Sequence, residues 1–173
     1  SLVIADSINL IGKLPIQGTE RLSFKLSTPG SGYAGHNVDC SERTGNPMHI
    51  YKLTNKKQIN EGMQTYTLHF CSREFLRNIR TKVSETFEGT IDQMVYKILD
   101  DEDYLDSRQF FSYQKTRNQD KITIPNIAPF KAIEMLCKKA LADDSKSVGY
   151  LFYQTTKGFN FRSFESMCVN SNG

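Results

Sequence analysis

The sequence predicts an α+β fold, in which a small antiparallel β-barrel precedes a mixed helical domain and a returning β-hairpin. In the first third of the chain, apolar and polar residues alternate with period two, as in half-buried strands. The middle changes to a period of 3.6, which is typical of amphipathic helices. The last part returns to aromatic alternation around a short turn. We expect these domains to cover residues 1–71, 72–146 and 147–173, the last holding the hairpin and the start of a further segment.

The composition is that of a folded protein without a membrane span. The 173 residues are 38% hydrophobic and 24% charged, and a chain of this length buries a core that needs no disulfide. Four cysteines without a Cys-x-x-Cys pair predict reduced thiols. Twenty-two Lys and Arg against nineteen Asp and Glu argue against a nucleic-acid-coating protein, although a local basic patch stays open. No apolar run approaches the roughly 20 residues of a membrane span, and no signal peptide is evident, so we expect an unexported, soluble chain.

The first strands are predicted from alternation. Residues 22–26, 49–53 and 65–70 alternate apolar and β-forming residues, and 60–62 supply a turn between the last two strands. These strands predict a β-meander or a small barrel.

Residues 27–48 are rich in glycine and proline and predict a long loop. This loop is either a surface excursion or an arm that becomes ordered against another subunit. Gly30, Gly32 and Gly35 match the spacing of a dinucleotide-binding fingerprint. No helix is predicted after them, so a bound phosphate would lack the helix N-terminus that this motif needs.

Three helices are predicted in the middle of the chain. The first begins after Ser72, with Phe75, Leu76 and Ile79 on its buried side and its arginines outside. A second covers 90–99, opens with a Thr90/Gln93 capping box and ends at the acidic run 100–103. The third begins at Pro129 and is closed by 143–145; a short strand, 122–125, precedes it. Residues 149–154 and 159–163 form the final hairpin.

No residue pattern supports catalysis, and we expect neither an enzyme nor a cofactor. The chain has no nucleophile elbow and no Cys-His signature. His36 and Cys40 flank Asp39, but in a glycine-rich segment this spacing does not predict a metal site. His49 and His69 lie on predicted strands, and we interpret them as solvent-facing strand residues and not as metal ligands.

Arg73, Arg77 and Arg80 share one face of the first predicted helix. This basic face has three interpretations: a contact with nucleic acid or another anion, a solvated surface, or a contact with an acidic neighbouring subunit.

The order of these elements resembles the baseplate hub, or tail hub, proteins of contractile-tailed bacteriophages, which are related to type VI secretion spike proteins. The resemblance is carried by residues 2–7, with their Asp6-Ser7, and by 20–26, 51–54, 65–78, 87–91, 124–130 and 150–161. It covers most of the chain. We expect the 173 residues to supply the first tail-tube-like barrel and the helical insertion of such a hub. The second barrel of the family is not represented in this sequence, as would be the case for a partial chain.

The resemblance implies a structural virion protein. Hub subunits form a homotrimer whose two barrels per subunit build a pseudo-hexameric ring between the tail tube protein and the central spike, in contact with other baseplate proteins. DNA would pass transiently through the ring. Because a ring of identical subunits presents complementary faces, the resemblance makes the basic helix face and the acidic run near Asp101 candidates for pairing between subunits. The implied candidate subunit-interface residues are Arg73, Arg77, Arg80, Asp101 and, from the long loop, Tyr33. The implied location is the tail baseplate of the virion, after assembly in the cytoplasm of the bacterial host.

Two other classes of function stay open. One is a nucleic-acid-binding module that uses the β-meander and the face of Arg73, Arg77 and Arg80, and it predicts salt-dependent binding of an oligonucleotide. The other is a small enzyme whose glycine-rich loop acts as a lid over a pocket with a perturbed titratable group.

Overall fold

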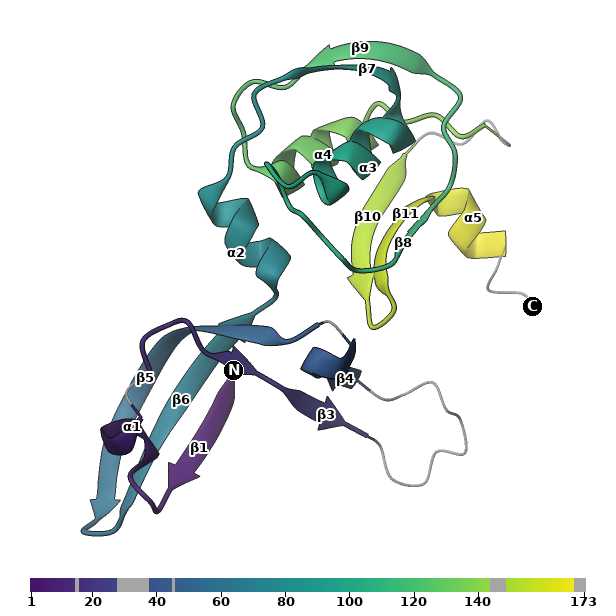
Figure 1. Cartoon of the computed structure of the whole chain (residues 1–173). Helices are drawn as coiled ribbons and strands as arrows, with labels where there is room; N and C mark the ends of the chain where they lie inside the picture. The colour runs from purple at the N-terminus through teal and green to yellow at the C-terminus, as the bar shows by residue number, and fades with distance from the viewer. Residues whose placement is uncertain (15, 28–37, 45, 144–148, 170–173) are drawn as a thin grey trace. The chain divides into compact units, whose positions relative to one another are not determined.

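The computed structural model describes all residues except 15, 28–37, 45, 144–148 and 170–173. The chain divides into two compact units, Ser1–Arg73 and Glu74–Gly173, which are described separately below (Figure 1). Both are built on β-sheets, and the second also carries the longer helices, so the fold is mixed α+β as predicted. All strand pairs are antiparallel except one in the second unit.

The first unit consists of one four-stranded sheet and one separate strand pair. The sheet has the order β1-β6-β5-β2, and β3 pairs with β4. The elements are β1 (Leu2–Asp6), α1 (Leu10–Lys13), β2 (Arg21–Leu22), β3 (Phe24–Leu26), β4 (Val38–Cys40), the 3-10 turn η1 (Glu42–Thr44), β5 (Met48–Asn60) and β6 (Met63–Cys71). The predicted hairpin around residues 60–62 is confirmed, and its strands are longer than alternation alone indicated.

Two predictions for this unit need correction. The strand predicted over 22–26 breaks at Ser23, because Leu22 pairs with Met48 of β5 whereas Phe24 pairs with Cys40 of β4. The loop predicted over 27–48 contains β4 and η1, so its second half is ordered by pairing with β3. The glycines at 30, 32 and 35 lie outside the described residues. Among the residues described, the two sheets do not close into a barrel, and the barrel stays a prediction.

The core of the first unit is small. Tyr66 and Leu68 alternate on one face of β6 and are buried with Ile50 of β5, as period two predicts. These three are the buried members of the cluster, and five partly buried residues pack around them: Ile4, Ile11, Ile16, Leu22 and Leu53.

Asp6 holds the turn that follows β1. Its carboxylate accepts hydrogen bonds from the backbone N–H of Ile8 (3.1 Å) and Leu10 (2.7 Å) and from Nε2 of Gln64 (3.1 Å). Burial raises the pKa of Asp6, but these donors favour the charged form and together hold the pKa below its ordinary value. The charged carboxylate of Asp6 thus links β1 to Gln64 of β6.

In the second unit, strands lie around two central helices (Figure 1). Helices α3 and α4 pack together, with α3 against β7 and α4 against β10. The elements are α2 (Arg73–Arg80), whose first residue belongs to the first unit, β7 (Thr86–Thr90), α3 (Ile91–Asp100), β8 (Phe111–Tyr113), β9 (Gln119–Thr123), α4 (Pro129–Cys137), β10 (Tyr150–Thr155), β11 (Gly158–Ser163) and α5 (Phe164–Val169). Strands β7 and β9 form one antiparallel pair, and the other sheet has the order β10-β11-β8.

The predicted signals for both central helices are confirmed. Thr90 and Gln93 form the capping box of α3, in which Oε1 of Gln93 accepts from the backbone N–H of Thr90 at 3.3 Å. Helix α3 ends at Asp100, the first residue of the acidic run. Pro129 is the first residue of α4. This helix ends at Cys137, earlier than the predicted end near 143–145, of which only Asp143 is described.

The final hairpin lies in the same compact unit as the helices. Strand β11 pairs in parallel with β8, and Phe159 and Phe161 are buried in the same cluster as Ile91, Ile98 and Ile133. Among the described residues, this cluster has nineteen buried members, so the hairpin contributes to the core that the helices build.

Shortening a core aromatic side chain is expected to destabilise the second unit. Phe161 is fully buried, with its ring centroid 4.5 Å from that of Tyr150. Phe161→Ala should lower the free energy of unfolding by about 3–5 kcal/mol, because it removes apolar contacts and leaves a cavity. Urea denaturation measures the change. The matched control is Phe164→Ala, at a side chain that is 53% exposed, and its effect should stay within about 0.5 kcal/mol. Equal losses in the two variants would contradict this core.

The carboxylate of Glu85, the residue before β7, is expected to control the ionisation of Tyr104. Glu85 accepts from Nζ of Lys97 and from Oη of Tyr104, each at 2.7 Å. Burial, followed by this hydrogen bond and the nearby carboxylates, raises the pKa of Tyr104 from 10 to about 12. The raised pKa stabilises the folded state fully below pH 10, and this contribution is lost as the pH rises towards 12.

In Glu85→Gln, the pKa of Tyr104 is expected to fall towards its ordinary value, since the accepting charge is gone. Absorbance at 295 nm against pH follows the ionisation, and a Tyr104→Phe protein identifies the contribution of this residue. A titration midpoint that is the same in the parent protein and in the Glu85→Gln variant would rule out the interaction.

Candidate functional site

The outer face of the sheet β10-β11-β8 carries the most distinctive group of polar and aromatic side chains in the second unit. Phe159 and Phe161 of β11 point into the core, so Asn160 and Arg162 lie on the opposite face. The register places Ser112 of β8 beside Asn160 on one side, and Tyr153 of β10 beside it on the other. Alternation therefore gives the sheet one apolar, covered face and one face for external contacts.

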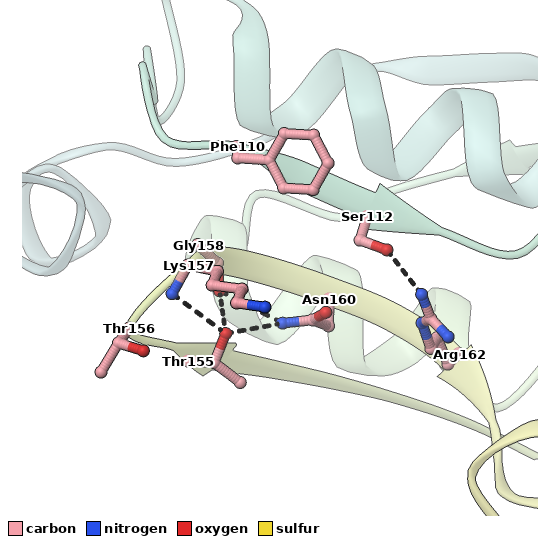
Figure 2. Close-up of a pocket in the computed structure, with 8 residues that line it drawn as sticks. All are labelled: Phe110, Ser112, Thr155, Thr156, Lys157, Gly158, Asn160 and Arg162. Atoms are coloured by element: carbon pink, nitrogen blue, oxygen red, sulfur yellow. Dashed lines mark hydrogen bonds between the residues drawn. The ribbon is translucent and has the colours of Figure 1, made fainter. Parts of the chain in front are cut away.

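A hollow of about 480 Å³ lies on this outer face (Figure 2). Figure 2 shows Phe110 and Ser112 along one side, the β10–β11 turn at one end and Arg162 at the other. Its lining residues are Phe110, Ser112, Thr155, Thr156, Lys157, Gly158, Asn160 and Arg162.

Gly158 sets the position of Phe110. Its φ is +132°, and a Cβ at this residue would lie only 2.1 Å from the carbonyl oxygen of Phe110. That carbonyl accepts a hydrogen bond from the backbone N–H of Phe159 at 2.9 Å. Glycine therefore allows the two chains to approach closely, and this contact holds the Phe110 ring, which is 68% exposed, at the edge of the hollow.

The hollow is basic. Nη2 of Arg162 donates to Oγ of Ser112 at 2.8 Å, which orients the guanidinium and leaves its other N–H groups available. Neither Arg162 nor Lys157 forms an ion pair with another residue that the structure describes. The eight described lining residues include no Asp, Glu, His or Cys. This chemistry suits binding of an anionic, hydrogen-bonding ligand, whereas a nucleophile with its base is not assembled there.

This site was not predicted from the sequence, although the local excess of Lys and Arg could have indicated it. Residues 107–119 and 149–163, which form the sheet and its turns, contain five Lys or Arg and no Asp or Glu. The formal charge of the whole chain is only +3, so these two segments are distinctly basic. They are far apart in sequence, and only the parallel β8–β11 pairing brings them together.

The basic helix is oriented differently from the prediction. Glu74 of α2 is buried and accepts from Oγ of Ser107 at 2.9 Å. Nε of Arg77 donates to the carbonyl of Tyr104 at 2.8 Å, and its Nη2 donates to the carbonyl of Glu102. Phe75 and Ile79, predicted to be buried, are 45% and 60% exposed. The predicted buried side of this helix is therefore wrong, because polar bonds to the 102–107 segment hold the opposite face.

Among the candidate interface residues, the structure brings Arg77 and the Asp101 turn together within one chain. Oδ1 of Asp101 accepts from the backbone N–H of Asp103 at 2.9 Å, and its carbonyl accepts from the N–H groups of Tyr104 and Asp106. Arg77 binds carbonyl groups of this same turn, so it is already committed inside its own subunit.

Arg80 is exposed, and Arg73 is half-buried. Tyr33 lies outside the described residues, as does His36.

His49 of β5 lies opposite Cys71 of β6, whereas His69 shares a 2.8 Å hydrogen bond with Oγ1 of Thr54. In the described part of the chain, no three His, Cys, Asp or Glu side chains are grouped so that they could hold a metal ion. All four cysteines are free thiols, and burial raises the pKa of Cys40, Cys71 and, to about 11, Cys137.

Comparison with known families and with curated proteins gave no match to this chain. Within the described residues, no helix combines the length and the apolar character needed to cross a membrane.

Loss of the Arg77 contacts is expected to destabilise the second unit. Arg77→Lys keeps the positive charge but cannot reach both carbonyls with a planar fork of donors. The free energy of unfolding, measured in urea, should fall by about 1–3 kcal/mol. Arg80→Lys is the control, since Arg80 is exposed, and it should change stability by less than about 0.5 kcal/mol. If both variants are as stable as the parent protein, Arg77 does not anchor the acidic turn.

Proposed function

We propose that this chain is a non-enzymatic structural subunit of a tail baseplate hub. In this proposal, three copies form a ring that joins the tail tube to the central spike in the virion, and the ring surrounds the path of the DNA. The first unit would form the tail-tube-like barrel, completed by neighbouring subunits. The proposal rests on the resemblance in element order and on one physical observation, the incompleteness of the first unit.

The first unit buries little apolar surface for its length. Among the residues that the structure describes, its core cluster has three buried members, compared with nineteen in the second unit. Several of its aliphatic side chains are instead largely exposed: Val3 at 72%, Leu14 at 66%, Ile8 at 63%, Leu26 at 60% and Ile59 at 58%. A domain of about 70 residues is marginally stable even with a full core, so such a surface favours burial against a partner.

The edge of its sheet points to the same conclusion. β1 is a terminal strand of the order β1-β6-β5-β2, and it carries the exposed Leu2 and Val3. An edge strand with unpaired backbone groups and apolar side chains is suited to pair with another strand. A ring of subunits would satisfy these groups, because each edge would meet a complementary surface of the next copy.

The mass in solution tests the proposal. Light scattering over a range of concentrations is expected to give three times the 19.8 kDa of the chain. Val3→Asp should shift the protein to monomers, since it puts a charge on the apolar edge. It should leave the circular dichroism spectrum unchanged, because Val3 is already 72% exposed.

Val3→Thr is the matched control, since threonine keeps the β-branched shape without adding charge. It should remain trimeric. A parent protein that is monomeric at every concentration would contradict the assembly proposal, and a Val3→Asp trimer would exclude β1 as the contact.

A further inference from the structure

We propose that the outer face of the β10-β11-β8 sheet binds a single-stranded nucleic acid, with a base stacked on Phe110 and the phosphates held by Lys157 and Arg162. This inference is independent of the hub proposal, because it concerns the second unit alone. It also uses different residues from the arginine face of α2.

The hollow carries positive charge that no neighbouring carboxylate pairs with among the described residues. Lys157 and Arg162 line one hollow, and neither forms an ion pair with a described residue. The segments that build the sheet contain no carboxylate, so the positive potential of this face is not neutralised locally. Glu165, at the start of α5, forms no ion pair with Arg162. A polyanion is the ligand whose charge complements such a surface.

An aromatic side chain is exposed beside these cations. Phe110 is 68% exposed at the rim of the same hollow. The backbone of Phe110 is held by its close contact with Gly158. Little conformational entropy of this residue is therefore lost when a ligand stacks on the ring. Tyr153 lies on the same face of the sheet, opposite Asn160. The unstacked bases of single-stranded nucleic acids bind by stacking on aromatic side chains of this kind, on an open and basic sheet.

Hydrogen-bonding groups also line the hollow. The hydroxyl of Thr156 can donate or accept, and that of Ser112, which accepts from Arg162, can still donate. The hydroxyl of Thr155 is already used within the β10–β11 turn, since it donates to the carbonyl of Gly158 and accepts from the backbone N–H of Lys157. The Nδ2 of Asn160 is bonded to Thr155 and to the carbonyl of Gly158, so its side-chain oxygen is left as an acceptor for base edges. An acidic peptide would use the two cations but would leave the aromatic surface unused. The combination therefore favours a nucleic acid strand over an acidic protein segment.

Fluorescence anisotropy of a labelled dT12 oligonucleotide with the full 173-residue chain tests the proposal. Lys157→Gln and Arg162→Gln are each expected to weaken binding and to reduce the slope of log affinity against log salt concentration by about 0.7. Phe110→Ala should weaken binding about tenfold or more, with the salt slope unchanged. A duplex of the same length should bind more weakly, because its bases are not available to stack.

The matched control is Arg73→Gln/Arg80→Gln, which removes positive charges from α2 and leaves the hollow intact. This variant should bind dT12 as the parent protein does. The proposal is overturned if dT12 does not bind, or if the α2 variant loses binding while Phe110→Ala retains it. It is also overturned if duplex or poly-glutamate competes as well as dT12, since that result would mean a general polyanion surface.

Discussion

The second unit depends on strand β11 lying between two neighbours. Phe159 and Phe161 enter the core from this strand, while Asn160 and Arg162 face outward. On its β8 side, the carbonyl of Phe161 accepts from the backbone N–H of Gln114 at 2.9 Å. The N–H of Ser163 donates to Oε1 of Gln114, also at 2.9 Å. A one-residue shift of β11 would exchange its two faces, burying a guanidinium and exposing two phenyl rings.

Buried polar side chains hold the segment between α3 and β9, which contains only the short strand β8. Oδ1 of Asp92 in α3 accepts from the N–H (3.1 Å) and the hydroxyl (2.7 Å) of Thr116. Arg77 and Glu74 of α2 bind the same segment nearer its start. Hydrogen bonds to helices α2 and α3 thus hold this segment in place. Breaking one of them would cost free energy, because it would leave a buried polar group without a partner. This arrangement brings Phe110 and Ser112 to the hollow.

The two units differ in how far each completes its own packing. The second has an apolar cluster of nineteen buried residues and presents a basic face outward. The first has a three-residue buried cluster, an open sheet edge and exposed aliphatic side chains. In physical terms, the second unit resembles a self-sufficient domain with a binding face, whereas the first resembles an element stabilised by association. The hub proposal and the nucleic-acid proposal therefore concern different units and can fail separately.

Strong periodicity and clear end signals were enough to predict several local elements. The α3 capping box, Pro129 at the start of α4, and the alternation of β6 and β11 all appear as predicted. Periodicity states which residues share a face, but it does not state which face is covered. On α2 the buried side was therefore decided by Arg77 and Glu74 finding partners near residues 102–107. Likewise, the division of 22–26 between two sheets and the parallel pairing of β8 with β11 depend on partners distant in sequence. The basic hollow exists only after that pairing, so its position cannot be predicted from either segment alone.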